Sequence, residues 1–161
     1  MLEPLKQFIC DSCGEVINSP EEGWIEWLEV YTDDGGRCSK FRICHQKGYS
    51  PYKSPLGCYN YTDHPDRADM HLHHFLEEEA IINERLSEVV DNPSARFLGI
   101  RVVDVKEYAE LLRRIKMPHF EEARLYFQKA KADHFFAPDD REYMFDKNKL
   151  KLLIEEYNVW L

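Results

Sequence analysis

Two cysteines near the start of the chain impose the strongest constraint on how it folds. Cys10 and Cys13 are separated by two residues, and Gly14 follows the second cysteine. Two thiolates at this spacing can grip one metal ion from a tight turn, and the glycine allows the backbone conformation that aims amide groups back at the sulfurs. Such a turn supplies half of a tetrahedral site. The sequence therefore predicts a metal site whose other ligands come from further along the chain.

The cysteine count and the N-terminus favour an intracellular metal protein over a disulfide-bonded one. Five cysteines, an odd number, occur in 161 residues, and the first residues lack the basic and apolar regions of a secretory signal. No apolar run approaches the roughly 18 residues of a membrane span. We therefore expect reduced thiols, a cytoplasmic location, no membrane partner and a structural Zn²⁺ ion as the cofactor.

A β-hairpin is predicted shortly after this turn. Residues 23–31 are rich in aromatic and β-branched side chains, and residues 32–36 contain the Asp-Gly and Gly-Gly steps of a tight turn. The return strand then runs over 38–45. Period-two alternation places His45 on the apolar face of this strand and Cys44 on the other face. If the apolar face is the buried one, His45 points inward and Cys44 outward.

Strand parity and position select the remaining ligands. His45 is favoured because it is expected to point inward, and Cys58 because it lies at the start of a short strand predicted over 57–61. Four protein ligands make a closed, structural site with no position for water or substrate. The predicted ligands are Cys10, Cys13, His45 and Cys58, with Cys44, Cys38, His71 and His74 as substitutes.

The turn formed by Cys10, Cys13 and Gly14 resembles the zinc knuckles of zinc ribbons and rubredoxin-like folds. The resemblance covers this turn and the hairpin after it. It implies a zinc ion and a β-rich subdomain, and it implies no particular activity. In a zinc ribbon the second ligand pair repeats the two-residue spacing, whereas the later cysteines of this chain are scattered. The resemblance therefore implies zinc binding rather than a complete ribbon.

A second histidine-rich motif runs from Asp69 to His74 and reads Asp-Met-His-Leu-His-His. An Asp-x-His-x-His string resembles the opening motif of metal-dependent amidohydrolases and of polymerase-and-histidinol-phosphatase phosphoesterases, which implies a metal-dependent hydrolase. Those families need a barrel longer than this chain. The flanking residues 67–90 are predicted to be helical, so that His71 and His74 share one face and His73 points elsewhere. Polar or capping histidines are therefore the favoured interpretation.

The last third of the chain is predicted to be mainly helical. Apolar residues recur at helical spacing, and acidic residues stand where N-caps are expected. The predicted elements are a strand over 97–103, a helix capped by Asp104, a helix over 120–131, a hairpin over 135–145 and a helix over 147–157 capped by Asp146.

This order of elements is also that of a winged helix-turn-helix, whose second helix enters the DNA major groove. Residues 96–134 contain 9 Lys and Arg against 6 Asp and Glu, although the whole chain has a net charge of −9. Glu121 and Glu122 lie near the start of the second helix and would repel phosphates, so a plain helical packing unit is favoured. The candidate nucleic-acid contacts are Arg124, Gln128, Lys129 and Lys131.

These observations together predict an α+β fold. A β-rich zinc-knuckle and hairpin subdomain over 1–65 packs on a mainly helical part over 66–161, for which a winged helix is the alternative, and the two form one compact unit. Because no catalytic set is recognised, the predicted function is a zinc-stabilised, non-enzymatic interaction or regulatory module with a protein partner. A nucleic-acid-binding regulator and a metal-dependent hydrolase that uses the His71–His74 cluster are the alternatives.

Overall fold

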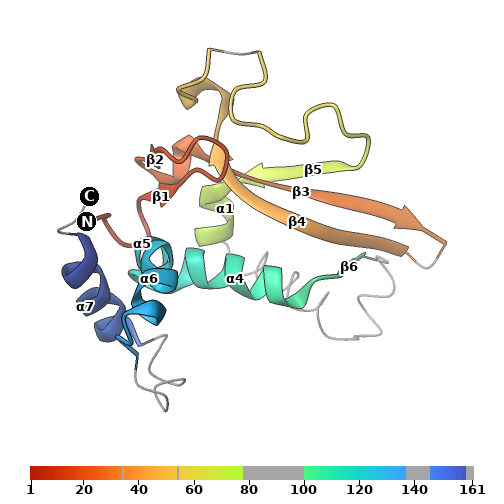
Figure 1. The fold of residues 1–161 in the computed structure, drawn as a ribbon. Helices are drawn as coiled ribbons and strands as arrows, with labels where there is room; N and C mark the ends of the chain where they lie inside the picture. Colours follow the sequence, from red (N-terminus) through yellow and green to blue (C-terminus); the bar gives the residue numbers. More distant parts are fainter. Residues whose placement is uncertain (34, 54, 78–99, 137–145, 159–161) are drawn as a thin grey trace.

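The chain has the α+β fold that its sequence predicts. The computed structural model describes residues 1–33, 35–53, 55–77, 100–136 and 146–158. Most strands lie in the N-terminal half and pair antiparallel, and most helices lie in the C-terminal half (Figure 1). Strands β1 (Phe8–Ile9) and β2 (Val16–Ile17) form a small sheet, and a four-stranded sheet has the order β5-β3-β4-β6. The strands of this main sheet are β3 (Gly23–Thr32), β4 (Gly35–His45), β5 (Arg67–His71) and β6 (Ile100–Val102).

The β3–β4 hairpin confirms the prediction made from its aromatic strand and glycine-rich turn. The two strands pair antiparallel, and the register shifts between Glu26 and Leu28. Opposite this shift, Lys40 has a φ of 59°, the left-handed conformation that can accompany a β-bulge. Residues 42–45 lie beyond the bulge and pair with the first residues of β3. The last residue of β4 is therefore held opposite the beginning of β3.

Residues 67–71, which the sequence predicts to be helical, form strand β5 instead. β5 pairs antiparallel with β3, with Trp24 opposite His71. The open edge of β3 offers backbone N–H and C=O groups that a strand can satisfy, and this non-local pairing outweighs local helical tendency. Helix α1 (Leu72–Glu77) follows directly. The rest of the predicted helix, over 78–90, lies outside the described residues.

The short strand predicted over 57–61 is also wrong, because these residues form turns and bends. They belong to a loop over 46–66 that contains the 3-10 helix η2 (Lys47–Tyr49). Gly57 has a φ of 57°, a conformation that glycine adopts without strain and that reverses the chain just before Cys58. Cys58 is therefore positioned by a loop rather than by a strand.

Strand β6 lies within the strand predicted over 97–103, of which residues 97–99 lie outside the described residues. It pairs parallel with β4 along Gly36 to Cys38. Both β5 and β6 come from the chain beyond residue 65, whereas the hairpin comes from before it. The main sheet thus combines strands from both predicted parts of the chain.

The two faces of the main sheet are covered differently. Helices α1 and α4 (Val105–Lys116) pack on one face, and the loop over 46–66 lies on the opposite side (Figure 1). On the helical side Trp27 stacks on Phe41 with ring centroids 5.9 Å apart, and Phe41 meets Tyr108 of α4 at 5.2 Å. These side chains belong to the first hydrophobic core.

The start of β3 needs a glycine because α1 approaches it closely. A Cβ atom added to Gly23 would lie 2.5 Å from Cδ2 of Leu72, the first residue of α1. The 3-10 helix η1 (Pro20–Glu22) precedes this point and also contacts α1. The segment just before β3 and the strand-to-helix junction after β5 are therefore neighbours.

The C-terminal helices build a second hydrophobic core. It contains side chains such as Phe120, Leu150 and Tyr157. Asp104 and Asp146 accept backbone hydrogen bonds at the N-termini of α4 and α7, which confirms both predicted caps. The helices of this core are α5 (Phe120–Ala123), α6 (Phe127–Ala132) and α7 (Lys147–Tyr157), with the 3-10 helix η3 (Arg124–Tyr126) between the first two.

Residues 137–145, which hold most of the hairpin predicted over 135–145, lie outside the described residues. Within the described ranges, none of the helices combines the length and the apolar character that a membrane crossing requires.

Candidate metal centre

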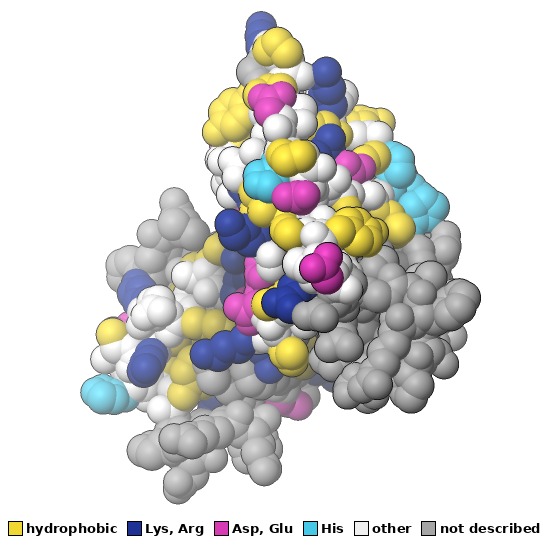
Figure 2. Space-filling view, turned by 90° about the vertical axis from the view of Figure 1, so that its right-hand side faces the viewer, with side chains coloured by type: hydrophobic (Ala, Val, Ile, Leu, Met, Phe, Trp, Pro, Cys, Tyr) yellow, Lys and Arg dark blue, Asp and Glu magenta, His cyan; other side chains and the backbone are white. Residues whose placement is uncertain are grey.

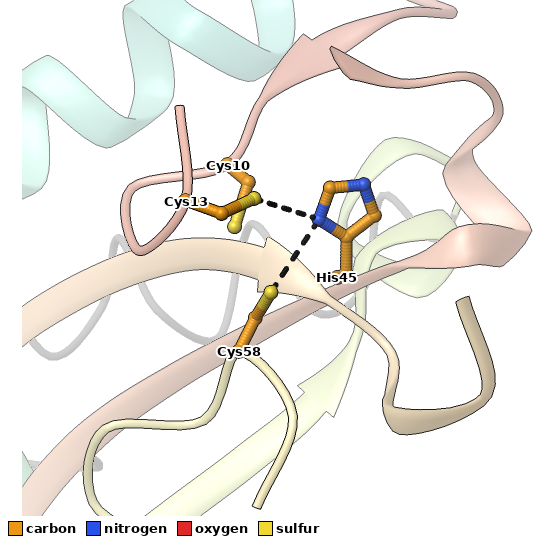
Figure 3. Close-up of side chains that lie close together, drawn as sticks. All are labelled: Cys10, Cys13, His45 and Cys58. Carbon is orange, nitrogen blue, oxygen red and sulfur yellow. Dashed lines mark hydrogen bonds between the residues drawn. The ribbon is translucent and has the colours of Figure 1, made fainter. Parts of the chain in front are cut away.

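Three cysteines and one histidine from separate segments meet beside one end of the main sheet. Cys10 and Cys13 lie at the turn between β1 and β2, His45 is the last residue of β4, and Cys58 lies in the loop over 46–66. Their side chains point toward a common centre (Figure 3). One donor atom from each of the four residues lies within 4.8 Å of the others. The structure thus brings together the four residues that the sequence favoured, in a group that could hold a metal ion.

The distances within this group fit a tetrahedral ion. Cys13 Sγ lies 3.5 Å from His45 Nδ1, and Cys58 Sγ lies 3.7 Å from the same nitrogen. Zinc bonds of about 2.3 Å to sulfur and about 2.0 Å to nitrogen would separate a sulfur and a nitrogen ligand by about 3.5 Å at the tetrahedral angle. Three thiols and one imidazole are also the donor types that zinc accepts. The residues therefore fit a zinc ion in both geometry and chemistry.

The imidazole of His45 is held in the orientation that a ligand needs. This side chain is buried, as strand parity predicts. Its Nε2 lies 3.2 Å from the carbonyl oxygen of Val16, to which it can donate a hydrogen bond. A proton on Nε2 leaves the lone pair on Nδ1, the nitrogen that faces the sulfurs. Strand β2 thus selects the tautomer that can bind a metal.

The Cys10–Cys13 turn has the amide arrangement expected of a knuckle. The N–H of Ser12 donates to Cys10 Sγ at 3.4 Å, and the N–H of Gly14 donates to the Cys10 carbonyl oxygen at 2.9 Å. Gly14 has a φ of 77°, the left-handed conformation predicted from its place after the second cysteine. These contacts form within five consecutive residues, which is why the sequence alone reveals the turn.

The two thiols of the turn differ in acidity. Burial alone would raise the pKa of Cys10, but hydrogen bonds from the backbone of Cys13, Ser12 and His45 outweigh burial and lower that pKa to about 7. Burial and the neighbouring Cys10 sulfur raise the pKa of Cys13 to about 12. Burial likewise raises the pKa of Cys58. One thiolate therefore forms readily at neutral pH, whereas a cation is needed to stabilise all three.

The prediction that Cys44 points outward is wrong, because this side chain is fully buried. It does lie on the opposite face of β4 from His45, but the loop over 46–66 covers that face too. Burial, reinforced by the charge of Glu26, raises the pKa of the Cys44 thiol. Cys38 is also buried, with its Sγ 3.7 Å from Glu29 Oε2. Neither substitute cysteine belongs to the group of four.

The substitute histidines His71 and His74 also lie outside that group. The prediction that they share one face of a helix is wrong, because His71 is the last residue of β5 and only His74 belongs to α1. The strand-to-helix junction instead places both rings close to that of His73.

Asp11, inside the knuckle, fastens the metal turn to the main sheet. Its backbone N–H donates to the carbonyl oxygen of Ile43 at 2.8 Å, and its Oδ2 accepts a hydrogen bond from the N–H of Ile43 at 2.8 Å. β6 pairs with β4 only along residues 36–38. The knuckle therefore satisfies backbone groups on a stretch of β4 that β6 does not reach.

A buried arginine connects this turn to the helices. Arg114 Nη1 lies 2.7 Å from Asp11 Oδ2, and Arg114 Nε lies 2.7 Å from Glu121 Oε2. Arg114 also donates to the carbonyl oxygen of Ile9 at 3.2 Å, and Glu121 accepts from the N–H of Ile9 at 2.8 Å. Burial would lower the pKa of Arg114, but its hydrogen bonds to Glu121 and the charges of Glu121 and Asp11 raise it. The guanidinium stays charged and joins α4, α5, β1 and the knuckle.

A second buried charge positions the loop that carries Cys58. Glu26 is 0% exposed in the middle of β3. Its carboxylate accepts hydrogen bonds from the N–H groups of Asn60 at 2.9 Å and Tyr61 at 3.3 Å, and Arg42 Nη1 lies 3.6 Å away. These contacts lie two and three residues after Cys58. Glu26 therefore pulls the loop onto the sheet and supports the fourth ligand position.

Sequence reasoning did not single out these supporting charges. The sequence does contain a signal for Glu26: a carboxylate in the middle of an apolar strand needs a hydrogen-bond partner if both faces of the strand are covered. Asp11 had another, since it lies between the two knuckle cysteines. No sequence pattern indicates that Arg114 and Glu121 pair with each other. From the sequence, Glu121 is interpreted only as a residue that would repel phosphates.

The candidate nucleic-acid contacts lie on the second core. Arg124 is engaged with Glu121 at 3.1 Å and with Asp11 at 3.4 Å. The ammonium group of Lys129 lies 5.2 Å from the ring centroid of Tyr157. Gln128 and Lys131 are exposed on α6. Nucleic-acid binding through these residues stays a prediction.

Comparisons with known proteins identify no relative: no family model, no curated protein and no solved structure matches the chain.

Proposed function

We propose that Cys10, Cys13, His45 and Cys58 bind one structural Zn²⁺ ion, and that the protein is a zinc-stabilised, non-enzymatic interaction or regulatory module. The observation that carries the proposal is the convergence of these four donors at tetrahedral spacing, within 4.8 Å of one another. Three thiolates and one imidazole form a common structural zinc set. When bound, the ion supplies a fixed cross-link and neutralises the thiolate charge.

The proposed ion fastens segments that have little other support. β1 and β2 contain two residues each, and Cys58 lies in a loop without regular strand pairing. Ser12 adds a hydrogen bond between the Cys10–Cys13 turn and this loop, because its hydroxyl donates to the carbonyl oxygen of Cys58. Zinc binding free energy becomes folding free energy when the unfolded chain lacks the site. The ion therefore stabilises both segments against the end of β4.

A closed coordination shell supports a structural role. Four protein ligands leave no coordination position for water or a substrate, which catalytic zinc sites keep open. The supporting charges of Asp11 and Glu26 are each turned toward backbone amides or arginines rather than toward a cleft. Their contacts hold the metal segments in place.

An exposed apolar part of the ligand-bearing loop is the proposed contact for a protein partner. Tyr49, Tyr52 and Leu56 are 53%, 49% and 40% exposed. Aromatic side chains are enriched in protein interfaces, where they bury large areas at low entropy cost. The same loop contains Cys58, so the zinc ion would stabilise the partner-binding surface. The free state of all five cysteines suits a reducing compartment, and the cytoplasmic location stays a prediction.

Metal analysis of protein purified without chelator tests the zinc site. We expect about one zinc per chain, and a cobalt-substituted sample should show thiolate-to-cobalt absorption. The variant Cys13→Ser should lose both, whereas Cys38→Ser should retain both because Cys38 lies outside the group. A wild-type protein that contains no zinc, with its thiols reduced, would contradict the proposal.

A further inference from the structure

Three histidines outside the closed site form a cluster where β5 ends and α1 begins. His71 is the last residue of β5, and His73 and His74 lie in the first turn of α1. Their ring centroids are 5.1 Å apart for His71 and His73, 4.2 Å for His73 and His74, and 5.8 Å for His71 and His74. Figure 2 shows one group of histidine side chains at the right-hand edge of the surface. All three side chains are partly exposed.

These ring separations bracket the value for imidazoles that share one ion. With metal–nitrogen bonds of about 2.0 Å and tetrahedral angles, two ligating rings have centroids about 5 Å apart. Among the described residues, only the Cys10 group already has all its donor atoms within 4.8 Å. The three histidine side chains would therefore have to rotate before one ion could contact all of them. Partial exposure leaves room for such rotations.

Two ring nitrogens in the cluster lack the partners that buried polar atoms normally have. The Nδ1 atoms of His71 and His73 are shielded from solvent and make no hydrogen bond. Trp24 packs against His71 with ring centroids 4.1 Å apart, and its indole N–H does not supply a partner because it is unpaired too. Buried polar atoms without partners are costly, so each one calls for an explanation. A bound ion would give these imidazoles a partner.

One carboxylate lies on an element beside the cluster. Glu21 belongs to η1, and η1 contacts α1, which carries His73 and His74. An ion bound by the three rings would therefore have an acidic group on the neighbouring element.

We propose that His71, His73 and His74 form a second, exchangeable site for a divalent transition-metal ion, with Glu21 as a nearby acidic group. Three imidazoles suit Zn²⁺, Ni²⁺ or Cu²⁺. Unlike the closed cysteine site, three protein ligands leave at least one position for water or for an outside ligand. The two sites therefore differ in role: one holds the fold together, and the other binds and releases an ion at the surface.

Calorimetric titration with Ni²⁺ tests the second site on the full chain with zinc already bound. We expect one Ni²⁺ per chain, with the zinc content unchanged. The variants His73→Ala and His74→Ala should each weaken this binding at least about tenfold, since even the loss of an indirect support costs 10- to 100-fold in metal affinity. His64→Ala is the matched control, because His64 is a surface histidine that lies 3.6 Å from Asp66 outside the cluster.

Folding is checked separately, through the zinc content and melting temperature of each variant, which should match those of the parent. A folded His73→Ala or His74→Ala variant that binds Ni²⁺ as tightly as the parent would overturn the proposal. So would a parent that binds no Ni²⁺, or one whose binding is lost on His64→Ala. These outcomes do not depend on the cysteine site, so the second site can fail while the structural zinc stands.

Discussion

The two hydrophobic cores of this protein are held together by different means. The first core includes side chains on both faces of the main sheet, under helices α1 and α4 on one side and the loop over 46–66 on the other, and it contains Cys10 and Cys58. The second core lies among α5, α6 and α7, and its described residues are aromatic and aliphatic side chains without a cysteine. The first joins segments that are distant in sequence, including two strands of two residues each. The second joins helices that follow one another closely. The proposed metal site thus lies where short, distant segments meet.

The junction between the cores is charged rather than apolar. Arg114 comes from α4 of the first core and Glu121 from α5 of the second, and the two are joined by hydrogen bonds of 2.7 and 3.0 Å. Asp11 of the knuckle contacts the same guanidinium. The turn that carries Cys10 and Cys13 therefore contacts the connection between the cores directly, through Asp11. Changes at the metal site are expected to reach the second core through this contact.

The largest expected effect is the loss of the metal. Cys13→Ser, or removal of zinc by a chelator, should destabilise the first core by an amount on the order of 10 kcal/mol, the binding energy typical of structural zinc. The second core should keep helical signal to a higher temperature, because it contains no ligand. Thermal unfolding followed by circular dichroism, and by tryptophan fluorescence in a Trp160→Phe background, checks both points, because the other two tryptophans of the chain, Trp24 and Trp27, lie in β3.

Cys38→Ser is the control for this comparison. It replaces a cysteine that is more buried than Cys13 and lies outside the metal group, and we expect a cost of about 1–3 kcal/mol from burying a hydroxyl. If Cys13→Ser melts at the same temperature as Cys38→Ser, the difference drawn between the two cores is wrong.

The next effect concerns the junction. Arg114→Met removes the guanidinium and leaves the buried Glu121 without its main partner, which should cost about 3–5 kcal/mol. Urea unfolding should then separate into two transitions, because the cores lose the contact that couples them. The double variant Arg114→Met with Glu121→Leu should recover part of the loss, since no unpaired charge remains. A single cooperative transition in Arg114→Met would show that other contacts couple the cores.

A smaller effect is expected at the loop that carries Cys58. Glu26→Gln keeps the side-chain shape but removes the charge that accepts from Asn60 and Tyr61, so stability should fall by about 1–3 kcal/mol. Zinc affinity should fall about 10- to 100-fold, the usual effect of mutating a residue that orients a metal ligand without binding the metal itself. Competition with a chromogenic chelator measures that affinity. Glu110→Gln, a partly exposed carboxylate on α4, should leave it unchanged.

The smallest effect is expected on the surface of the second core. Lys131→Glu changes an exposed residue of α6 and should alter stability by no more than about 0.5 kcal/mol. If this core is a packing unit, the parent and the variant should both fail to bind a short DNA duplex at low salt. Steep salt-dependent binding by the parent, weakened in Lys131→Glu, would instead support the winged-helix alternative.

The sequence by itself determined the features that arise within a few residues. The Cys10–Cys13 turn, the hairpin turn after β3 and the caps at Asp104 and Asp146 each depend on backbone groups close to the side chain that satisfies them. Their patterns are therefore visible without any knowledge of the rest of the fold. The same local reasoning placed His45 on a buried face, because alternation along β4 needs only neighbouring residues.

Only the tertiary structure decided which distant groups meet. Residues 67–71 became a strand because β3 had an open edge, and Cys44 became buried because a loop folded over the second face of the sheet. Cys58 lies near His45 in a loop that Glu26 holds on the sheet. Such contacts depend on the relative placement of segments tens of residues apart. Local propensity carries no information about that placement, since the free energy that fixes it comes from the contacts themselves.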